Sequence, residues 1–260
     1  MKCLNIRHYR RSPRKFGPQR KIISFDEFIL TLMKLRLGLL NNDLAKRFGV
    51  SPTLFSQIFH CWVATMGQTV LWPSKEQIIA SKPSRFSSLP DICAIIDCTE
   101  IFIKTPKDPN HKNSTWSNYK HHNTAKFIIA VAPNSAITFV SPVYGGRASD
   151  KAITLDSGFL DMCEACDMIQ ADKDFNIQEE CAVRSIWLHV PPGLRGEVQM
   201  TSAAIEKTKK VANLQILVEQ VIRRLKSFRI LSCQLPITLV PSLDKIISVC
   251  AALTNFQKPI

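Results

Sequence analysis

Apolar residues recur at two different spacings along this chain, and the spacing changes near residue 92. Before that point they recur every three or four residues, which predicts amphipathic helices. After it, short apolar runs bounded by turn residues predict strands over ICAIID, IFIK, AKFIIAVAP and AITFVSPV, the last two forming a hairpin. A helical region therefore precedes a sheet.

Three helices are predicted in the helical region. Ser24 with Glu27 three residues later has the capping-box pattern, and the helix that follows ends at Gly38. Asn42 or Asp43 can cap a short second helix over LAKRF. After a glycine turn, a serine at 51 and a proline at 52 open a third helix. Two helices, a glycine-containing turn and a further helix are the layout of a helix-turn-helix.

One face of the third helix is polar and is the candidate for contact with base edges in duplex DNA. A small helical bundle with a solvated polar face is the alternative for this segment taken alone. The basic composition favours DNA: Lys and Arg number 34 against 21 Asp and Glu, a formal charge of +13. The candidate contacts are Thr53, Ser56, Gln57 and His60.

The composition also restricts where the protein works. Residues 1–21 contain no acid and read as a flexible basic arm. No apolar run reaches the roughly 18–20 residues of a membrane span, so no membrane partner is expected and the chain is read as intracellular. Nine cysteines, an odd number and mostly in apolar runs, fit reduced thiols better than disulfides.

The predicted organisation has four parts: a basic arm over 1–22, a helix-turn-helix domain over 23–70, a linker over 71–91 with at most a short helix near 75–80, and an α/β domain over 92–260. In this last part three antiparallel strands, a helix, a further strand and later helices predict an α/β fold. We expect a ribonuclease H-like mixed sheet flanked by helices.

Three acids far apart in sequence are candidate catalytic residues and metal ligands. Asp97 ends the apolar run ICAII and Asp172 follows MIQA, so both are expected at strand ends. Glu219 lies beside the apolar stripe of the helix over 202–228, although taken alone it could be a surface partner of Arg223. Such acids can hold the divalent ions of a phosphoryl-transfer site. Asp150 is the alternative second acid, with the pattern of a helix first-turn residue.

Cations near these acids are candidate DNA contacts. Arg223 and Lys226 follow Glu219 on the same helix, Lys173 follows Asp172, and Lys120 lies in a polar loop before the hairpin. An RNA-directed nuclease is a weaker reading, because a helix-turn-helix suits the major groove of duplex DNA.

Taken together, the motifs IIDCTEIFI, YKHHNTAKFIIAVAP, YGGRASDK, ADKDF and VEQVIRRLKSFRIL resemble those of PIF/Harbinger superfamily transposases, whose DDE-type endonuclease domain follows a helix-turn-helix. The resemblance implies cleavage of double-stranded DNA with Mg²⁺ or Mn²⁺ bound by Asp97, Asp172 and Glu219. It also implies a nuclear location, a Myb-like DNA-binding partner and a possible homo-oligomer.

The chain departs from the pattern that the resemblance predicts along the run LVEQVIRR and at two positions near the expected site. Asp174 stands where the family usually has glycine, next to the expected metal, and Gln215 stands where it usually has arginine. Both departures favour an alternative function, a transposase-derived protein that binds DNA but has lost catalysis.

Overall fold

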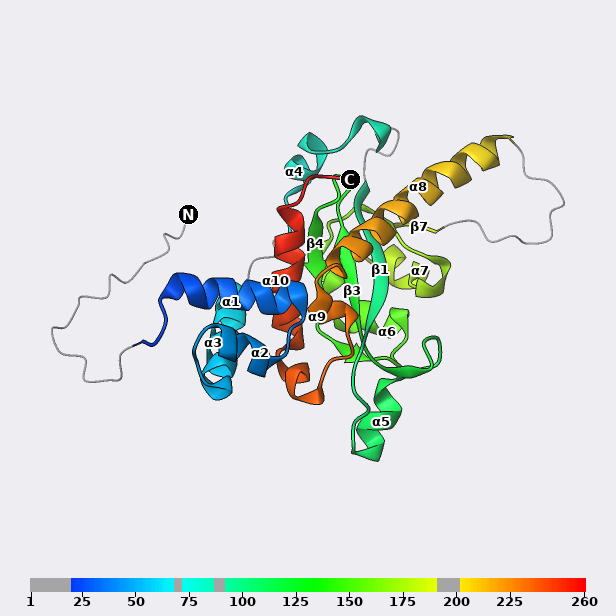
Figure 1. The fold of residues 1–260 in the computed structure, drawn as a ribbon. Coiled ribbons are helices and arrows are strands. Elements are labelled where there is room, and N and C mark those ends of the chain that lie inside the picture. The colour runs from blue at the N-terminus through cyan, green and yellow to red at the C-terminus, as the bar shows by residue number, and fades with distance from the viewer. Residues whose placement is uncertain (1–19, 68–71, 87–91, 191–201) are drawn as a thin grey trace.

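The computed structural model describes residues 20–67, 72–86, 92–190 and 202–260, with the side chains of residue 85 and of 202–213 left out (Figure 1). The predicted basic arm, apart from its last residues, lies outside the described residues, and so does PPG at 191–193, a proline and glycine run that predicts the end of the preceding strand.

The three helices predicted before residue 70 are confirmed as α1 (Ser24–Leu37), α2 (Asn41–Arg47) and α3 (Pro52–Met66). Gly38 ends α1 in the left-handed conformation, with φ of 65°, which glycine adopts at little cost. Ser51 caps α3 by accepting a hydrogen bond from the backbone N–H of Leu54 at 3.2 Å.

The caps predicted for the first two helices are wrong. Ile23 precedes α1 without a side-chain cap, because the side chains of Ser24 and Glu27 have other partners. Ser24 Oγ accepts from the guanidinium of Arg20 at 2.6 Å, and the Glu27 carboxylate accepts from Trp62 Nε1 of α3 at 3.1 Å. In place of Asn42 or Asp43, Leu40 precedes α2 and gives it no side-chain cap, while Asp43 pairs with Arg47 on the helix surface.

The segment predicted as a linker contains α4 (Lys75–Ala80) and the short 3-10 helix η1 (Ser84–Phe86). Ser74 and Gln77 form a capping box at the start of α4. Ile78 is buried in the core, and Lys75 lies 3.2 Å from a carboxylate oxygen of Asp167. The segment therefore packs against the sheet region.

The sheet has the mixed pairing expected of a ribonuclease H-like fold. Strand β1 pairs with β3 antiparallel and with β6 parallel, β6 pairs with β7 parallel, and β2, β4 and β5 all pair antiparallel with β3. The helix α5 (Pro109–Thr115), which sequence reasoning did not predict, follows β1 in the chain and projects below the sheet in the view of Figure 1. The strands are β1 (Ile92–Phe102), β2 (Trp116–Ser117), β3 (His122–Val131), β4 (Ile137–Val140), β5 (Tyr144–Gly145), β6 (Met168–Gln170) and β7 (Trp187–His189).

Helices cover both faces of the sheet, as the alternation of buried side chains along β1 requires. Ile95 and Ile101 belong to one core and Ala94 and Ile96 to the other. The first core is closed by α8 (Ser202–Leu225), α9 (Arg229–Ser232), η4 (Ile237–Ser242) and α10 (Leu243–Asn255). The second is closed by α6 (Asp150–Asp156), η2 (Phe159–Met162), η3 (Lys173–Phe175) and α7 (Gln178–Val183).

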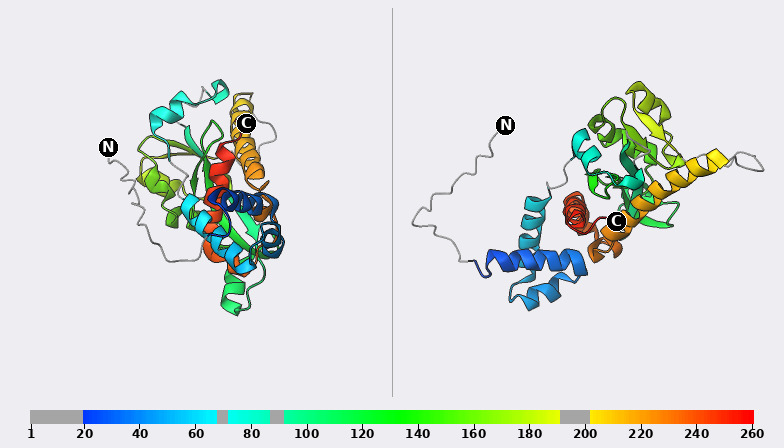
Figure 2. Two further views of the ribbon diagram at one scale, coloured as in Figure 1. Left: turned by 60° about the vertical axis from the view of Figure 1, so that its left-hand side comes forward. Right: turned by 90° about the horizontal axis from the view of Figure 1, so that it is seen from above.

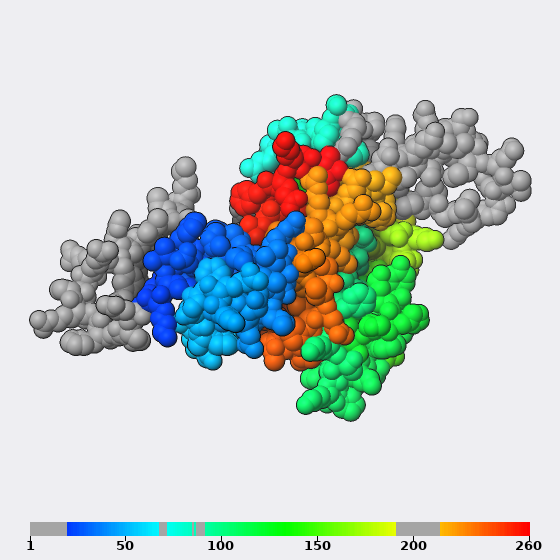
Figure 3. Space-filling model, viewed as in Figure 1, coloured from blue at the N-terminus to red at the C-terminus, as the bar shows by residue number. Residues whose placement is uncertain are grey.

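Helices α1–α3 pack against the C-terminal helices. Figure 2 shows α10 lying between the helical region and the sheet, and Figure 3 shows the helical region in direct contact with the segment from 214 to the C-terminus. Phe55 and Phe59 of α3 are in the same continuous core as Leu243 and Ile246 of α10. The domain boundaries drawn from the sequence stay predictions.

One expectation about apolar runs was wrong. The segment Ile237–Asn255 is 19 residues long with a mean hydropathy of 1.5, which is enough by length and composition for a membrane span. It comprises η4 and α10, and the buried residues of α10, among them Ile246, Ile247 and Cys250, pack into the first core. This packing explains why the segment is so apolar.

Candidate active site

Asp97 lies in the middle of β1, not at a strand end as predicted. The runs ICAIID and IFIK form one continuous strand, because β3 pairs with β1 from Ile95 to Phe102 and holds Asp97 opposite Ile129. On the other side of β1, the pairing with β6 extends only to Ile95. Asp97 is therefore just past the end of its parallel neighbour, from which the chain continues to Asp172.

The carboxyl group of Asp97 is costly to ionise where it lies. Burial, together with the charges of Asp150, Asp172 and Glu219, raises its pKa to about 7, while the hydrogen bond from the backbone N–H of Cys98 acts in the opposite direction. The structure thus places acids from β1, α6, the start of η3 and α8 in one electrostatic neighbourhood.

The other predicted acids differ in how they are held. Asp172 caps η3 by accepting the backbone N–H of Lys173 at 2.7 Å and is half-buried. Glu219 is exposed on α8, off the predicted apolar stripe. Of that stripe, the residues with described side chains are all buried: Leu214, Val218, Val221 and Leu225.

The alternative second acid, Asp150, is paired with Lys126, a residue that sequence reasoning missed. Both side chains are largely buried, with 20% and 14% of their surface exposed. Lys126 lies opposite Glu100 across the β1–β3 ladder and also donates to the backbone oxygen of Ala148 at 3.3 Å. Burial alone would lower the pKa of Lys126, but the hydrogen bond and charge of Asp150 raise it. The signal was present in the sequence, since Lys126 is the one charged residue in the run AKFIIAVA.

The donor set fits a hard divalent cation in its chemistry. Carboxylate oxygens are the ligands that Mg²⁺ and Mn²⁺ prefer, and a cation would remove the cost of ionising Asp97. Oε1 of Gln215, one turn before Glu219, is buried and accepts no hydrogen bond from the described residues. However, within the described ranges no three His, Cys, Asp or Glu side chains gather closely enough to hold one ion. The acids share a neighbourhood without forming a complete coordination shell.

Cations lie next to the acids, at several of the predicted positions. Lys226 is half-buried and donates to the backbone oxygen of Glu100 at 3.0 Å. Its pKa is lowered by burial and then by the charge of Lys120, so the two ammonium groups are electrostatic neighbours. The Lys120 ammonium lies 4.4 Å from the ring centre of the exposed Tyr119. Lys173 and Arg223 are exposed.

The predicted DNA-contacting face of α3 is divided by the fold. Thr53 and Gln57 are exposed, as contact with base edges requires. Ser56 and His60 instead line a cavity against the segment after α9, and His60 Nδ1 lies 3.0 Å from Oγ of Ser242 in η4. A base-contacting role for His60 does not fit this arrangement, because its ring already has a partner inside the protein.

The chain matches two family models and one curated relative. Residues 96–255 match the DDE superfamily endonuclease, and residues 20–70 match the helix-turn-helix of DDE superfamily endonuclease. The relative, Protein ALP1-like from Arabidopsis thaliana, is 26% identical over 153 residues, which are 57% of this chain and 37% of that protein. The chain thus spans little more than a third of this relative's length.

The comparisons agree with the geometry. The endonuclease model covers more than half of the chain and includes all four acids, and the helix-turn-helix model covers α1–α3. The resemblance to DDE-type transposases is confirmed at this level, and the chain belongs to the DDE superfamily endonucleases, with the helix-turn-helix that accompanies them.

Proposed function

We propose that this protein is a metal-dependent DNA endonuclease of the PIF/Harbinger transposase type. The observation that carries the proposal is the half-buried Asp97, whose carboxyl group interacts electrostatically with three other acids from separate elements. Such a concentration of negative charge is unfavourable without a cation, and strongly perturbed acids of this kind mark functional sites.

In this proposal Asp97, Asp172 and Glu219 hold Mg²⁺ or Mn²⁺. When bound, the metal would supply polarisation of the scissile phosphodiester and activation of the attacking hydroxyl. Asp172 is already oriented by the backbone N–H of Lys173, whereas Glu219 is free to turn on its exposed helix face. Asp150 is paired with Lys126 of β3, so it would help to fix the part of the site next to the sheet and would not bind metal itself.

In this proposal the neighbouring cations bind phosphate groups of the DNA backbone and so hold the DNA next to the acids. Lys226 is fixed by its bond to the backbone oxygen of Glu100, and Lys120 extends the positive charge outward over the exposed ring of Tyr119. Phosphate groups would relieve the repulsion between the two ammonium groups, which now lowers the pKa of Lys226. Lys173 and Arg223 would add contacts further along the strand, and Thr53 and Gln57 would contact the duplex at α3.

The test is a nicking assay on supercoiled plasmid with Mn²⁺ or Mg²⁺. We expect the wild-type protein to nick and Asp97→Ala to lose more activity than the roughly 10- to 100-fold that follows loss of a residue outside the coordination shell. Asp43→Ala, which removes an exposed acid from α2, is the matched control and should retain activity. Equal metal-dependent nicking by wild type and Asp97→Ala would refute the assignment.

A second candidate function is a transposase-derived DNA-binding protein without catalysis. Two features of the described residues favour it. No three potential ligands surround one ion position, and Lys126 neutralises the charge of Asp150 by forming an ion pair with it. Calorimetry with Mn²⁺ near neutral pH separates the two functions. Heat of binding that is lost in Asp97→Ala supports the nuclease, whereas salt-sensitive DNA binding without any metal binding supports the second candidate.

The proposal extends to the setting of the reaction. A nuclear location, a Myb-like DNA-binding partner and a homo-oligomer are part of it, on the strength of the resemblance to PIF/Harbinger transposases. Localisation of the tagged full chain in cells and its mass in solution would test the first and last of these.

A further inference from the structure

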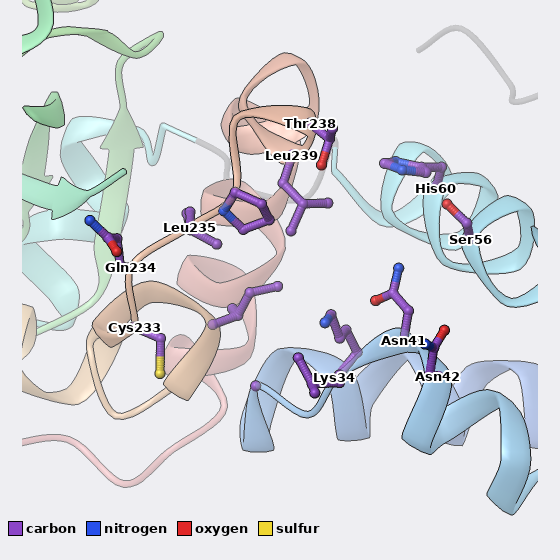
Figure 4. A pocket seen from close by; sticks show the side chains of 14 residues that line it. Lys34, Asn41, Asn42, Ser56, His60, Cys233, Gln234, Leu235, Thr238 and Leu239 are labelled. Carbon is purple, nitrogen blue, oxygen red and sulfur yellow. The ribbon is translucent and has the colours of Figure 1, made fainter. Parts of the chain in front are cut away.

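A cavity of about 510 Å³ lies between the helical region and the segment from α9 to η4 (Figure 4). None of the four acids lines it. Its volume is in the range of ligand pockets, and polar side chains supply much of its wall. These are Asn41, Asn42, Ser56, His60, Gln234 and Thr238.

Lys34 of α1 contributes a buried ammonium group to this cavity. The residue is only 8% exposed, and Nζ donates to the backbone oxygen of Leu39 at 2.5 Å. Within the described residues no carboxylate lies at ion-pair distance from Lys34, and burial lowers its pKa with only the Cys233 thiol acting in the opposite direction. A buried charge without a counter-charge is costly.

The hydrogen bond from Lys34 to the chain after α1 does not explain why a charged side chain is buried here. The bond to Leu39 satisfies one of three N–H donors and needs no full positive charge. The groups around the cavity are mainly donors or groups able to donate: three amides and two hydroxyls from both walls. A cation surrounded by neutral donors is the arrangement that binds an anion.

We propose that this cavity binds a phosphate group, with Lys34 as its counter-charge and Asn42 among its hydrogen-bond donors. The net charge of +13 makes phosphate-bearing ligands the natural partners of this protein. The phosphate belongs either to the backbone of DNA lying across the helical region or to a free phosphate compound. In both cases it bridges α1–α3 and the segment after α9.

The first arm of the test measures thermal unfolding of the full chain during titration with inorganic phosphate at constant ionic strength. Phosphate at about fivefold above its Kd should raise the midpoint by about 2–4 °C. Lys34→Met should abolish this shift, and Lys245→Met, which removes an exposed lysine of α10, should retain it. Asn42→Ala changes an exposed residue and keeps Lys34, so it should fold and need about fivefold more phosphate for the same shift.

The second arm measures the binding of labelled duplex DNA over a range of salt concentrations. If the phosphate comes from DNA, Lys34→Met should lower the slope of log K against log salt by about 1, and Lys245→Met should leave it unchanged. A phosphate shift with an unchanged DNA slope identifies a free phosphate compound. If Lys34→Met changes neither measurement, the proposal is wrong. Neither arm requires metal or nicking, so this result is independent of the proposed nuclease activity.

Discussion

Among the lysines that the structure describes, Lys126 and Lys34 both have largely buried side chains, and their surroundings are opposite. Lys126 in the sheet region pairs with Asp150, which raises its pKa although burial acts against it. Lys34 in the helical region has a backbone oxygen as its partner, and burial lowers its pKa. The first charge is balanced by the chain itself, whereas the second is balanced only if something else binds. A buried charge is thus informative mainly through what does or does not compensate it.

The largest expected effect concerns Asp97, because Lys126 pairs with Asp150 and not with Asp97. The pKa of Asp97 is about 7 in the folded protein against an ordinary 3.8, so between these pH values the folded state binds more protons than the unfolded state. In metal-free protein the free energy of unfolding should therefore fall as pH rises from about 4 to 7, by on the order of 4 kcal/mol. Asp97→Asn should lose this dependence and be the more stable protein at pH 8.

Urea denaturation of both proteins in EDTA at several pH values measures this effect. Parallel pH profiles for wild type and Asp97→Asn would show that Asp97 ionises without cost, and the acid cluster would then need no cation. Addition of Mn²⁺ should reduce the difference at pH 8, because a bound cation favours the ionised carboxylate.

The next prediction compares the two lysines directly. Lys126→Met leaves Asp150 largely buried without its cation and should lower the free energy of unfolding by about 3 kcal/mol. Lys34→Met removes an uncompensated charge and leaves no acid behind, so stability without added anion should be unchanged or raised by up to about 1 kcal/mol. Urea denaturation without phosphate and with EDTA measures both.

A double variant and a surface variant serve as controls for this comparison. Lys126→Met combined with Asp150→Leu removes both charges and should recover most of the loss. Lys245→Met should change stability by less than about 0.5 kcal/mol. Equal destabilisation by the two lysine substitutions would remove the distinction between the two regions.

Most of the fold followed from local patterns in the sequence. Helical spacing, the proline after Ser51 and the glycine at 38 located α1–α3, and apolar runs located β1, β3, β4 and β6, whereas the two-residue strands β2 and β5 were not predicted. The apolar stripe on α8 predicted its buried side chains correctly, because the stripe is a property of one helix. The helix α5 was missed, since none of its side chains is buried and so no apolar period marks it.

The arrangement of the site depended on contacts between distant segments. Asp97 was expected at a strand end because ICAIID reads as a complete strand, but pairing with β3 extends β1 to Phe102. The ion pair of Lys126 with Asp150 joins residues 24 positions apart and has no local pattern. In the same way, only the packing of α3 against η4 turns His60 inward. Sequence patterns named the acids, while the tertiary contacts decide which are paired.

The smallest predicted effect tests the same contrast between local and tertiary contacts within the helical region. Ser51 and Ser24 both carry helix-start patterns, but only Ser51 caps its helix, while Ser24 contacts Arg20 at the surface. Ser51→Ala should lower the free energy of unfolding by about 1 kcal/mol, because the N–H of Leu54 loses its partner. Ser24→Ala should cost less than about 0.5 kcal/mol. Since α3 supplies Ser56 and His60 to the cavity wall, a weakened start of α3 should also reduce the stabilisation by phosphate; equal effects of the two alanines on urea denaturation would mean that tertiary packing alone holds this wall.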